Sequence, residues 1–98
     1  MTPRFSIRPL AEQEIAEAIL WYEEHDVGLG GEFLRAVDVR LGDIKRRPDS
    51  FPEVYPRIRR ALLARFPYAL FFVVTGAVIN VIACMHTRRD PRRWQRRA

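Results

Sequence analysis

Cysteine is almost absent from this sequence of 98 residues, which contains Cys84 alone. A single cysteine excludes an internal disulfide and a multi-cysteine zinc site, and it favours a reducing compartment. Residues 1–5 lack the apolar core and the small-residue cleavage site of a secretory signal. We therefore expect a cytoplasmic protein, and one domain over residues 1–98, because this length is too short for two.

Patterns that carry catalysis are also scarce. His25 and His86 lie far apart in the chain, and no Gly-x-Ser-x-Gly motif occurs. Glu23 and Glu24 are neighbours on a predicted helix, so their carboxylates diverge. The glycines of residues 28–31 follow no strand and precede no Lys-Ser/Thr pair, which argues against a phosphate-binding loop. We therefore expect neither a metal ion nor a cofactor, and we exclude metal-dependent, acyl-transfer and glycosidase chemistry.

Acidic residues are rare in the second half of the chain. Residues 1–50 carry seven Lys/Arg and ten Asp/Glu, a net charge of −3. Residues 51–98 carry ten arginines against only Glu53 and Asp90, a net charge of +8. Arginine suits bidentate contacts with phosphate or carboxylate. The Arg-rich C-terminal tail, residues 87–98, is therefore expected either to bind an anionic surface or only to keep the protein soluble.

Charged residues are missing from one long run, Phe66–His86, which has no Lys, Arg, Asp or Glu. Its length would suit a transmembrane helix. However, Pro67 opens the run, Thr75 and Gly76 stand at its centre, and the flanking pieces are rich in Phe, Val and Ile, which favour strands. Two strands joined by a tight turn explain these residues without placing polar groups in lipid, so we expect no membrane contact.

Hydrophobic periodicity predicts an α+β fold of the order β-α-α-β-β-β, with a helical hairpin on one face of an antiparallel sheet. Phe5 and Ile7 should point inward from the first strand. Leu34, Val37, Leu41 and Ile44 should form the buried face of the second helix, with Phe33 beside them. The predicted elements are the strand Arg4–Arg8, the helices Leu10–Glu24 and Glu32–Arg46, the loop Asp49–Pro56, and a meander of the strands Arg59–Phe66, Tyr68–Thr75 and Val78–His86.

The central predicted strand is apolar on both faces. One face carries Tyr68, Leu70, Phe72 and Val74, and the other carries Ala69, Phe71 and Val73. Two helices can cover only one face of a sheet, so the other should expose an apolar patch that awaits a partner segment. Alternatively, the N-terminal strand and the tail fold over that patch.

His86 ends the last predicted strand, in the most basic part of the sequence. The cations expected around it are Arg88 and Arg89 after the strand, and Arg59, Arg60 and Arg65 on a neighbouring strand. A histidine among guanidinium groups can act as a general acid or base on an RNA 2′-hydroxyl while arginine stabilises the phosphate charge. A strand-end histidine bonded to backbone, with solvated arginines, explains the same residues.

Several segments resemble the RelE/ParE toxin superfamily. They are the helical hairpin, Ile58–Ala61, Phe66–Phe72 and the ending Met85–Trp94. Such toxins are encoded beside an antitoxin whose extended or helical tail wraps the toxin. The resemblance therefore implies growth inhibition, a part in plasmid stabilisation, and a heteromer of toxin and antitoxin.

The superfamily divides by target. RelE-like members cleave messenger RNA on the ribosome without a metal, and for that class the resemblance implies catalytic roles for His86, Arg65 and Arg88. ParE-like members poison DNA gyrase. Ala69 stands where nuclease members often carry arginine, no tyrosine follows Tyr68, and Phe66–Phe72 looks ParE-like. The resemblance therefore favours a gyrase-binding toxin, with the ribonuclease and an inactive antitoxin-binding module as alternatives.

Binding residues are also implied by the resemblance. The target- or nucleic-acid-binding set is Arg59, Arg60, Arg88, Arg89, Arg92, Arg93 and Trp94. The antitoxin-binding set is Tyr68, Leu70, Phe72 and Val74.

Overall fold

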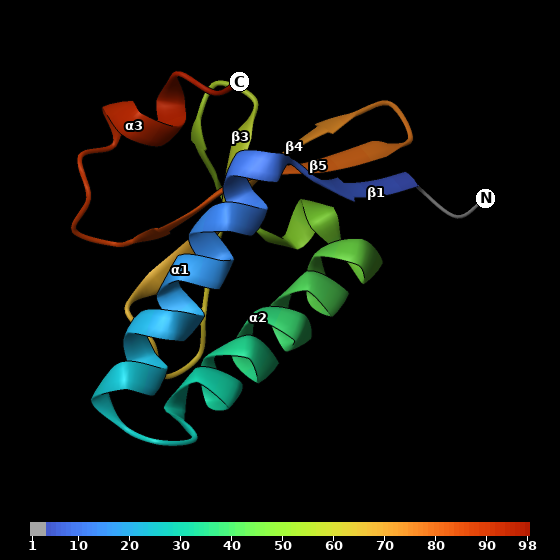
Figure 1. Ribbon diagram of the computed structural model, residues 1–98. Helices are drawn as coiled ribbons and strands as arrows, with labels where there is room; N and C mark the ends of the chain where they lie inside the picture. The colour runs from blue at the N-terminus through green and yellow to red at the C-terminus, as the bar shows by residue number, and fades with distance from the viewer. Residues whose placement is uncertain (1–3) are drawn as a thin grey trace.

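The structure is a computed structural model that describes residues 4–98. Its helices and strands follow one another along the chain as Figure 1 shows. They are β1 (Arg4–Ile7), α1 (Pro9–His25), α2 (Leu29–Arg46), a 3-10 turn (Pro48–Ser50), β2 (Glu53–Tyr55), β3 (Ile58–Leu62), β4 (Tyr68–Thr75), β5 (Val78–His86) and α3 (Arg92–Gln95).

The five strands form one sheet in the order β1-β5-β4-β3-β2. Neighbours pair antiparallel except at one edge, where β1 runs parallel to β5, with Arg4 opposite Val78 and Ile7 opposite Val81. The prediction of a wholly antiparallel sheet was therefore wrong for β1. Parallel pairing needs a long crossover, and the helical hairpin with three strands supplies it between β1 and β5.

The predicted loop Asp49–Pro56 was wrong in part, because it contains the 3-10 turn and β2. Glu53 pairs with Arg59 at the outer edge of the sheet, where flanking prolines are tolerated. The predicted strand Arg59–Phe66 proved too long at its end, because β3 stops at Leu62. The chain then turns through Arg65, whose φ of 71° is in the left-handed region and is incompatible with a strand.

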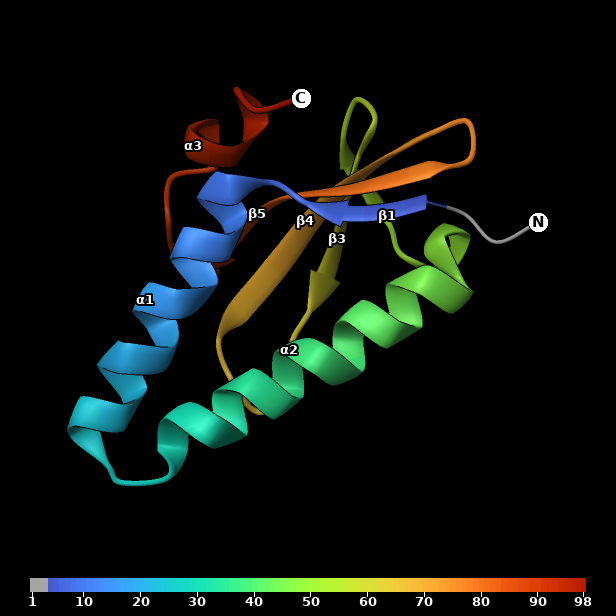
Figure 2. The ribbon, with the colours of Figure 1, turned by 45° about the vertical axis from the view of Figure 1, so that its right-hand side comes forward.

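Both long helices lie on one face of the sheet, as predicted (Figure 2). Phe5 and Ile7 pack against this core as expected. On α2, however, Phe33 is fully buried while Leu34 is 42% exposed, so the inward face runs through Phe33 rather than Leu34. The side chains buried on this side of the sheet are Ala11, Ile15, Ala18, Phe33, Val37, Ile44, Ala61, Leu63, Leu70, Phe72, Ile79, Val81 and Cys84.

The turn between the helices is fixed by Glu23. Its carboxylate accepts hydrogen bonds from the backbone N–H groups of Gly28 (3.0 and 3.1 Å) and Gly30 (3.0 Å). These bonds satisfy N–H groups that have no partner in the first turn of a helix. The second helix therefore begins at Leu29, three residues before the predicted start, and Gly28 turns the chain with a φ of 93°.

The second face of the sheet is covered by the C-terminal tail. The Trp94 ring of α3 stacks on Phe71 with centroids 4.2 Å apart. The alternative in which the tail folds over this face is therefore the one observed, whereas β1 extends the edge of the sheet. The cluster on this face comprises Ile58, Ala69, Phe71, Val73, Ile82, Ala83, Met85 and Trp94.

The apolar run Phe66–His86 forms β4, β5 and their turn, as predicted. Across residues 4–98, none of the helices combines the length and the hydropathy that crossing a membrane requires.

Candidate functional site

A groove of about 650 Å³ lies between α1 and the ends of β4 and β5. Its walls come from three parts of the chain that are distant in sequence: α1, the β4–β5 end of the sheet, and the tail. The lining residues are Glu14, Glu17, Ala18, Trp21, Tyr22, Pro67, Tyr68, Cys84, Met85, His86, Arg89 and Arg93. The structure thus brings His86 and two tail arginines together around one hollow.

His86 is half-buried at the end of β5, and its ring meets the edge of Tyr68 with centroids 5.4 Å apart. The Arg88 backbone N–H donates to His86 Nδ1 (3.0 Å). A nitrogen that accepts a hydrogen bond carries no proton, so Nε2 carries it in the neutral ring. In this geometry His86 presents a proton donor, and it would have to break its bond to Arg88 before Nε2 could act as a base.

Two phenols share the groove with His86. Burial raises the pKa of Tyr22 above its ordinary value, and the nearby Tyr68 raises it further. Burial also raises the pKa of Tyr68, Cys84 adds to that shift, and Arg89 opposes it. Both hydroxyls therefore stay protonated at neutral pH and offer hydrogen-bond donors to a ligand.

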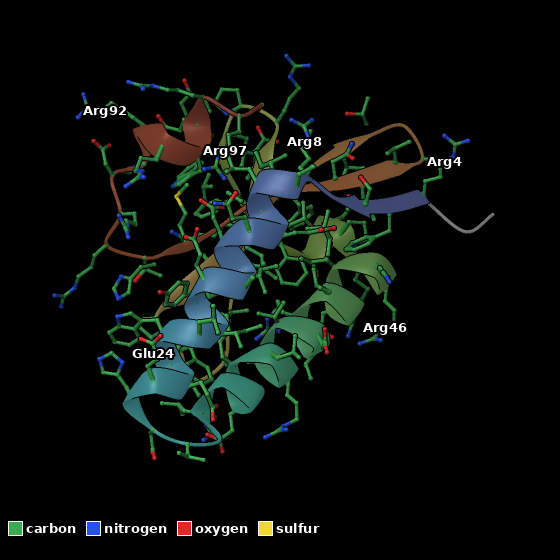
Figure 3. The ribbon with its side chains drawn as sticks, in the orientation of Figure 1. Arg4, Arg8, Glu24, Arg46, Arg92 and Arg97 are labelled. Atoms are coloured by element: carbon green, nitrogen blue, oxygen red, sulfur yellow. The ribbon has the colours of Figure 1, made fainter. Side chains whose placement is uncertain are left out.

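Arg97 holds the tail to the body of the protein. It makes two contacts with Glu14 (2.7 and 2.9 Å), and it donates to the Ile82 carbonyl (3.1 Å). Glu14 also accepts a hydrogen bond from the Cys84 N–H (3.0 Å). Arg8 donates to the Arg97 carbonyl (3.0 Å), beside the start of α1 (Figure 3). Arg97 therefore acts in the fold, although its charge suggested a solvated residue.

The other tail arginines differ in what they contact. Arg92 pairs with Asp90 (2.6 Å) and holds the pKa of that carboxyl down at about 2. Arg88, Arg89, Arg93 and Arg96 are exposed, and none of them forms an ion pair within residues 4–98. These four cations are the part of the tail available to an anionic partner.

The predicted arginines of the other strand lie away from His86. β4 separates β3 from β5, so Arg59 and Arg60 are two strands distant. Arg59 donates to the Phe51 carbonyl (2.6 Å), and Arg60 Nε is buried without a partner in the described chain. Arg65 lines a second hollow beside α2, 4.0 Å from Glu32. The structure does not bring Arg65 and His86 into one site.

The residues assigned to antitoxin binding lie under the helices. Leu70 and Phe72 are fully buried in the core, while Tyr68 and Val74 are half-buried at its ends. Only Tyr68 of this set lines the groove. Trp94, assigned to target binding, is likewise buried on Phe71. Strand alternation identified the two faces correctly, but it could not say which one the helices cover.

The α1 wall of the groove was missed by the sequence reasoning. Glu14, Glu17 and Trp21 follow one another at helical spacing, which is the signal that could have grouped them on one side of α1. Within residues 4–98, no three His, Cys, Asp or Glu side chains converge as metal ligands.

Comparison with known proteins gives a likeness of fold. In sequence, no protein-family profile and no curated protein matches the chain. In structure, the chain is similar to a chain described as "Chromosomal ParDE TA system from P. aeruginosa", with a TM-score of 0.65 and 18% identity. The likeness covers 87% of this chain and 96% of that one. At this identity it establishes a shared fold.

Proposed function

We propose that this chain is the toxin of a type II toxin–antitoxin pair, held inactive by its antitoxin, and that it inhibits growth by binding DNA gyrase. The observation that carries the proposal is the fold it shares, over nearly the whole of both chains, with a chain of a ParDE toxin–antitoxin system. Fold alone does not fix function, so the residues must decide the mode of action.

A binding mode is supported by the tail. Four exposed cations lie on the segment that follows His86, and Arg97 fixes this segment to the body of the protein; they are Arg88, Arg89, Arg93 and Arg96. Fixed cations speed encounter with an acidic surface and lose little freedom on binding. Such a surface suits the docking of a small protein onto a much larger target.

A binding mode is also supported by the surroundings of His86. Its Nδ1 already accepts from the Arg88 N–H, and Arg65 lies at a different hollow. General acid–base cleavage of RNA needs a base and a phosphate-stabilising cation at one place. The catalytic set that the resemblance implies for a nuclease, His86, Arg65 and Arg88, is therefore incomplete, because Arg65 lies away from His86.

The test is inducible expression of the chain alone in bacteria, with nucleoid morphology and messenger RNA integrity followed together. We expect filamentous cells, an induced DNA-damage response and intact transcripts. The purified chain should also inhibit DNA supercoiling by gyrase in vitro. Rapid transcript cleavage would refute the gyrase proposal, and growth without any defect, with soluble protein confirmed, would leave only an inactive antitoxin-binding module.

Two variants sharpen the test. Arg88→Ala/Arg89→Ala should weaken growth arrest and gyrase inhibition, and the loss of gyrase inhibition should shrink as the salt concentration rises, because salt screens these exposed charges. Arg35→Ala is the matched control, because Arg35 is an exposed cation of α2 without an ion pair within residues 4–98. Equal loss in both variants would refute a specific role for the tail.

The second candidate is a metal-independent endoribonuclease, and one observation favours it. His86, Tyr68, Arg89 and Arg93 line one groove that could hold a nucleotide. In that case Arg89 and Arg93 would take the place intended for Arg65. His86→Ala separates the two candidates: growth arrest should disappear for a nuclease and persist for a gyrase-binding toxin.

A further inference from the structure

One edge of β5 lies open beyond the end of β1. β1 pairs with β5 as far as Val81, whereas β5 continues to His86. The end of β5, at Cys84, Met85 and His86, lines the groove opposite α1. An unpaired edge of this kind presents backbone N–H and C=O groups that a further strand can bind.

The beginning of this edge is occupied by two side chains. Cys84 N–H donates to Glu14 (3.0 Å), and the Ile82 carbonyl accepts from Arg97 (3.1 Å). The Glu14–Arg97 pair thus supplies the donor and the acceptor that a neighbouring strand would supply. Directly after β1 ends, these two side chains therefore form the hydrogen bonds that the backbone of a neighbouring strand would form.

The next two backbone groups along this edge form no such hydrogen bonds within residues 4–98. Because the Cys84 N–H points away from β4, the alternation of an antiparallel ladder directs the Cys84 carbonyl and the His86 N–H to the same open edge. Within residues 4–98, no turn and no side chain bonds either group. The two groups bracket Met85, so one residue of a parallel strand can donate to Cys84 and accept from His86.

The charge beside this edge is positive. Arg89 and Arg93 line the groove, and neither forms an ion pair within residues 4–98. Glu14 is engaged by Arg97, which leaves Glu17 as the one acidic side chain of the lining outside an ion pair. A ligand with carboxylates therefore complements the groove better than one with cations.

We propose that the groove binds an extended, acidic segment of a partner protein, which adds to β5 opposite Met85 and directs its carboxylates to Arg89 and Arg93. Strand addition supplies main-chain hydrogen bonds, and the groove side chains select the sequence. The proposal deepens the proposed function, on which it rests for the existence of a protein partner, by assigning that partner a surface and a chemistry.

The test selects ligands from a displayed library of random peptides of about ten residues, a length that covers a strand. Selection against the purified full chain should enrich Asp and Glu. Arg89→Glu/Arg93→Glu should weaken binding of the selected peptides by about tenfold or more, since it replaces attraction with repulsion. The matched control Arg35→Glu should change it by less than about twofold, because the charge on α2 lies outside the groove.

Two readouts test strand addition itself. Exchange of the His86 amide hydrogen should slow when a selected peptide binds, and N-methylation of the peptide should abolish binding at alternate residues only, because alternate N–H groups face β5. Basic peptides, binding that ignores Arg89 and Arg93, or unchanged His86 exchange would each overturn the proposal. Growth arrest is measured separately. Peptide binding without growth arrest would refute the proposed toxin function but support this docking surface. Growth arrest without peptide binding would support the toxin function and refute the docking surface.

Discussion

Arg97 and Glu14 lie 83 positions apart in the sequence and form a two-point ion pair, with Nη1–Oε1 at 2.7 Å and Nη2–Oε2 at 2.9 Å. Their side chains are 18% and 17% exposed. The pair joins α1, the edge of β5 and the tail at one point. The pair therefore has two structural roles: it occupies the sheet edge after β1, and it fixes the position of the exposed tail arginines.

Arg97→Ala should destabilise the protein. Removing one partner of a poorly exposed pair leaves the other charge uncompensated, and we expect the free energy of unfolding to fall by about 2 kcal/mol. Urea denaturation measures it. Arg92→Ala is the control, because Arg92 pairs with Asp90 at the surface, where ion pairs contribute little. Equal losses of unfolding free energy in the two variants would show that the pair with Glu14 stabilises the fold no more than the surface pair with Asp90 does.

A double-mutant cycle isolates the pair itself. Glu14→Ala, Arg97→Ala and the double variant should give a coupling free energy of about 1–3 kcal/mol, as contacting charged residues do. Each single variant also leaves one backbone group of β5 without its partner, the Cys84 N–H in Glu14→Ala and the Ile82 carbonyl in Arg97→Ala, so the two single losses should be similar. Additive losses would mean that the two residues act independently.

The turn between α1 and α2 gives a second prediction. A Cβ at Gly30 would lie 2.7 Å from the Ile19 carbonyl oxygen, whereas one at Gly31 meets only the flexible Arg35 side chain, at 3.7 Å. Gly30→Ala should therefore lower the free energy of unfolding by about 2 kcal/mol through overpacking. Gly31→Ala should raise it by up to about 1 kcal/mol, since alanine favours a helix. Urea denaturation of both variants checks the contrast, and a neutral Gly30→Ala would contradict the close packing of the helices.

The long elements of this fold were predictable because they repeat a pattern. The helical stripe through Val37, Leu41 and Ile44 and the strand-favouring Phe and Val residues of β4 each extend over several residues, so the type of each element was correct even where its ends shifted. The face of α2 was misassigned at Leu34 because Phe33 lies one position away on the same stripe. Only packing against the sheet separates the two.

The short elements and the site could not be predicted from the sequence, and the reason is physical. β2 has three residues and α3 has four, which is too few to show a period. The parallel pairing of β1 and the clasp of Glu14 by Arg97 join distant parts of the chain, and no local pattern records them. His86 and the tail were placed together by proximity in sequence, but the α1 wall of their groove appears only once the chain is folded.

The two tryptophans give a third prediction. Trp94 is 7% exposed and stacks on Phe71, whereas Trp21 is 52% exposed on α1. Trp94→Ala should lower the free energy of unfolding by about 3 kcal/mol and uncover the second face of the sheet. Trp21→Ala should change it far less. Denaturation and binding of a hydrophobic dye measure the two effects, and dye binding by Trp21→Ala alone would contradict the assignment of the tail as the cover.

Cys84 provides the fourth prediction. Burial, with a smaller contribution from the Glu14 carboxylate, raises the pKa of its thiol from the usual 9.0 to about 12. Only the thiolate is a nucleophile, so the buried thiol should react with a disulfide reagent near neutral pH only when the chain opens. Labelling should be slow in the native protein and fast in urea. Fast labelling without denaturant would contradict the burial of β5.

The same shift in the Cys84 pKa makes stability depend on pH. In the unfolded chain the thiol loses its proton near pH 9.0, but in the folded chain it keeps the proton until about 12. The free energy of unfolding should therefore be unaffected by this group below pH 9.0 and should fall as the pH rises from 9.0 towards 12, because only the unfolded state gains from ionisation. Cys84→Ala should remove part of that decline, while the raised pKa values of Tyr22 and Tyr68 leave the rest. Identical slopes in the native chain and in Cys84→Ala would mean that the thiol is more solvated than its place on β5 requires.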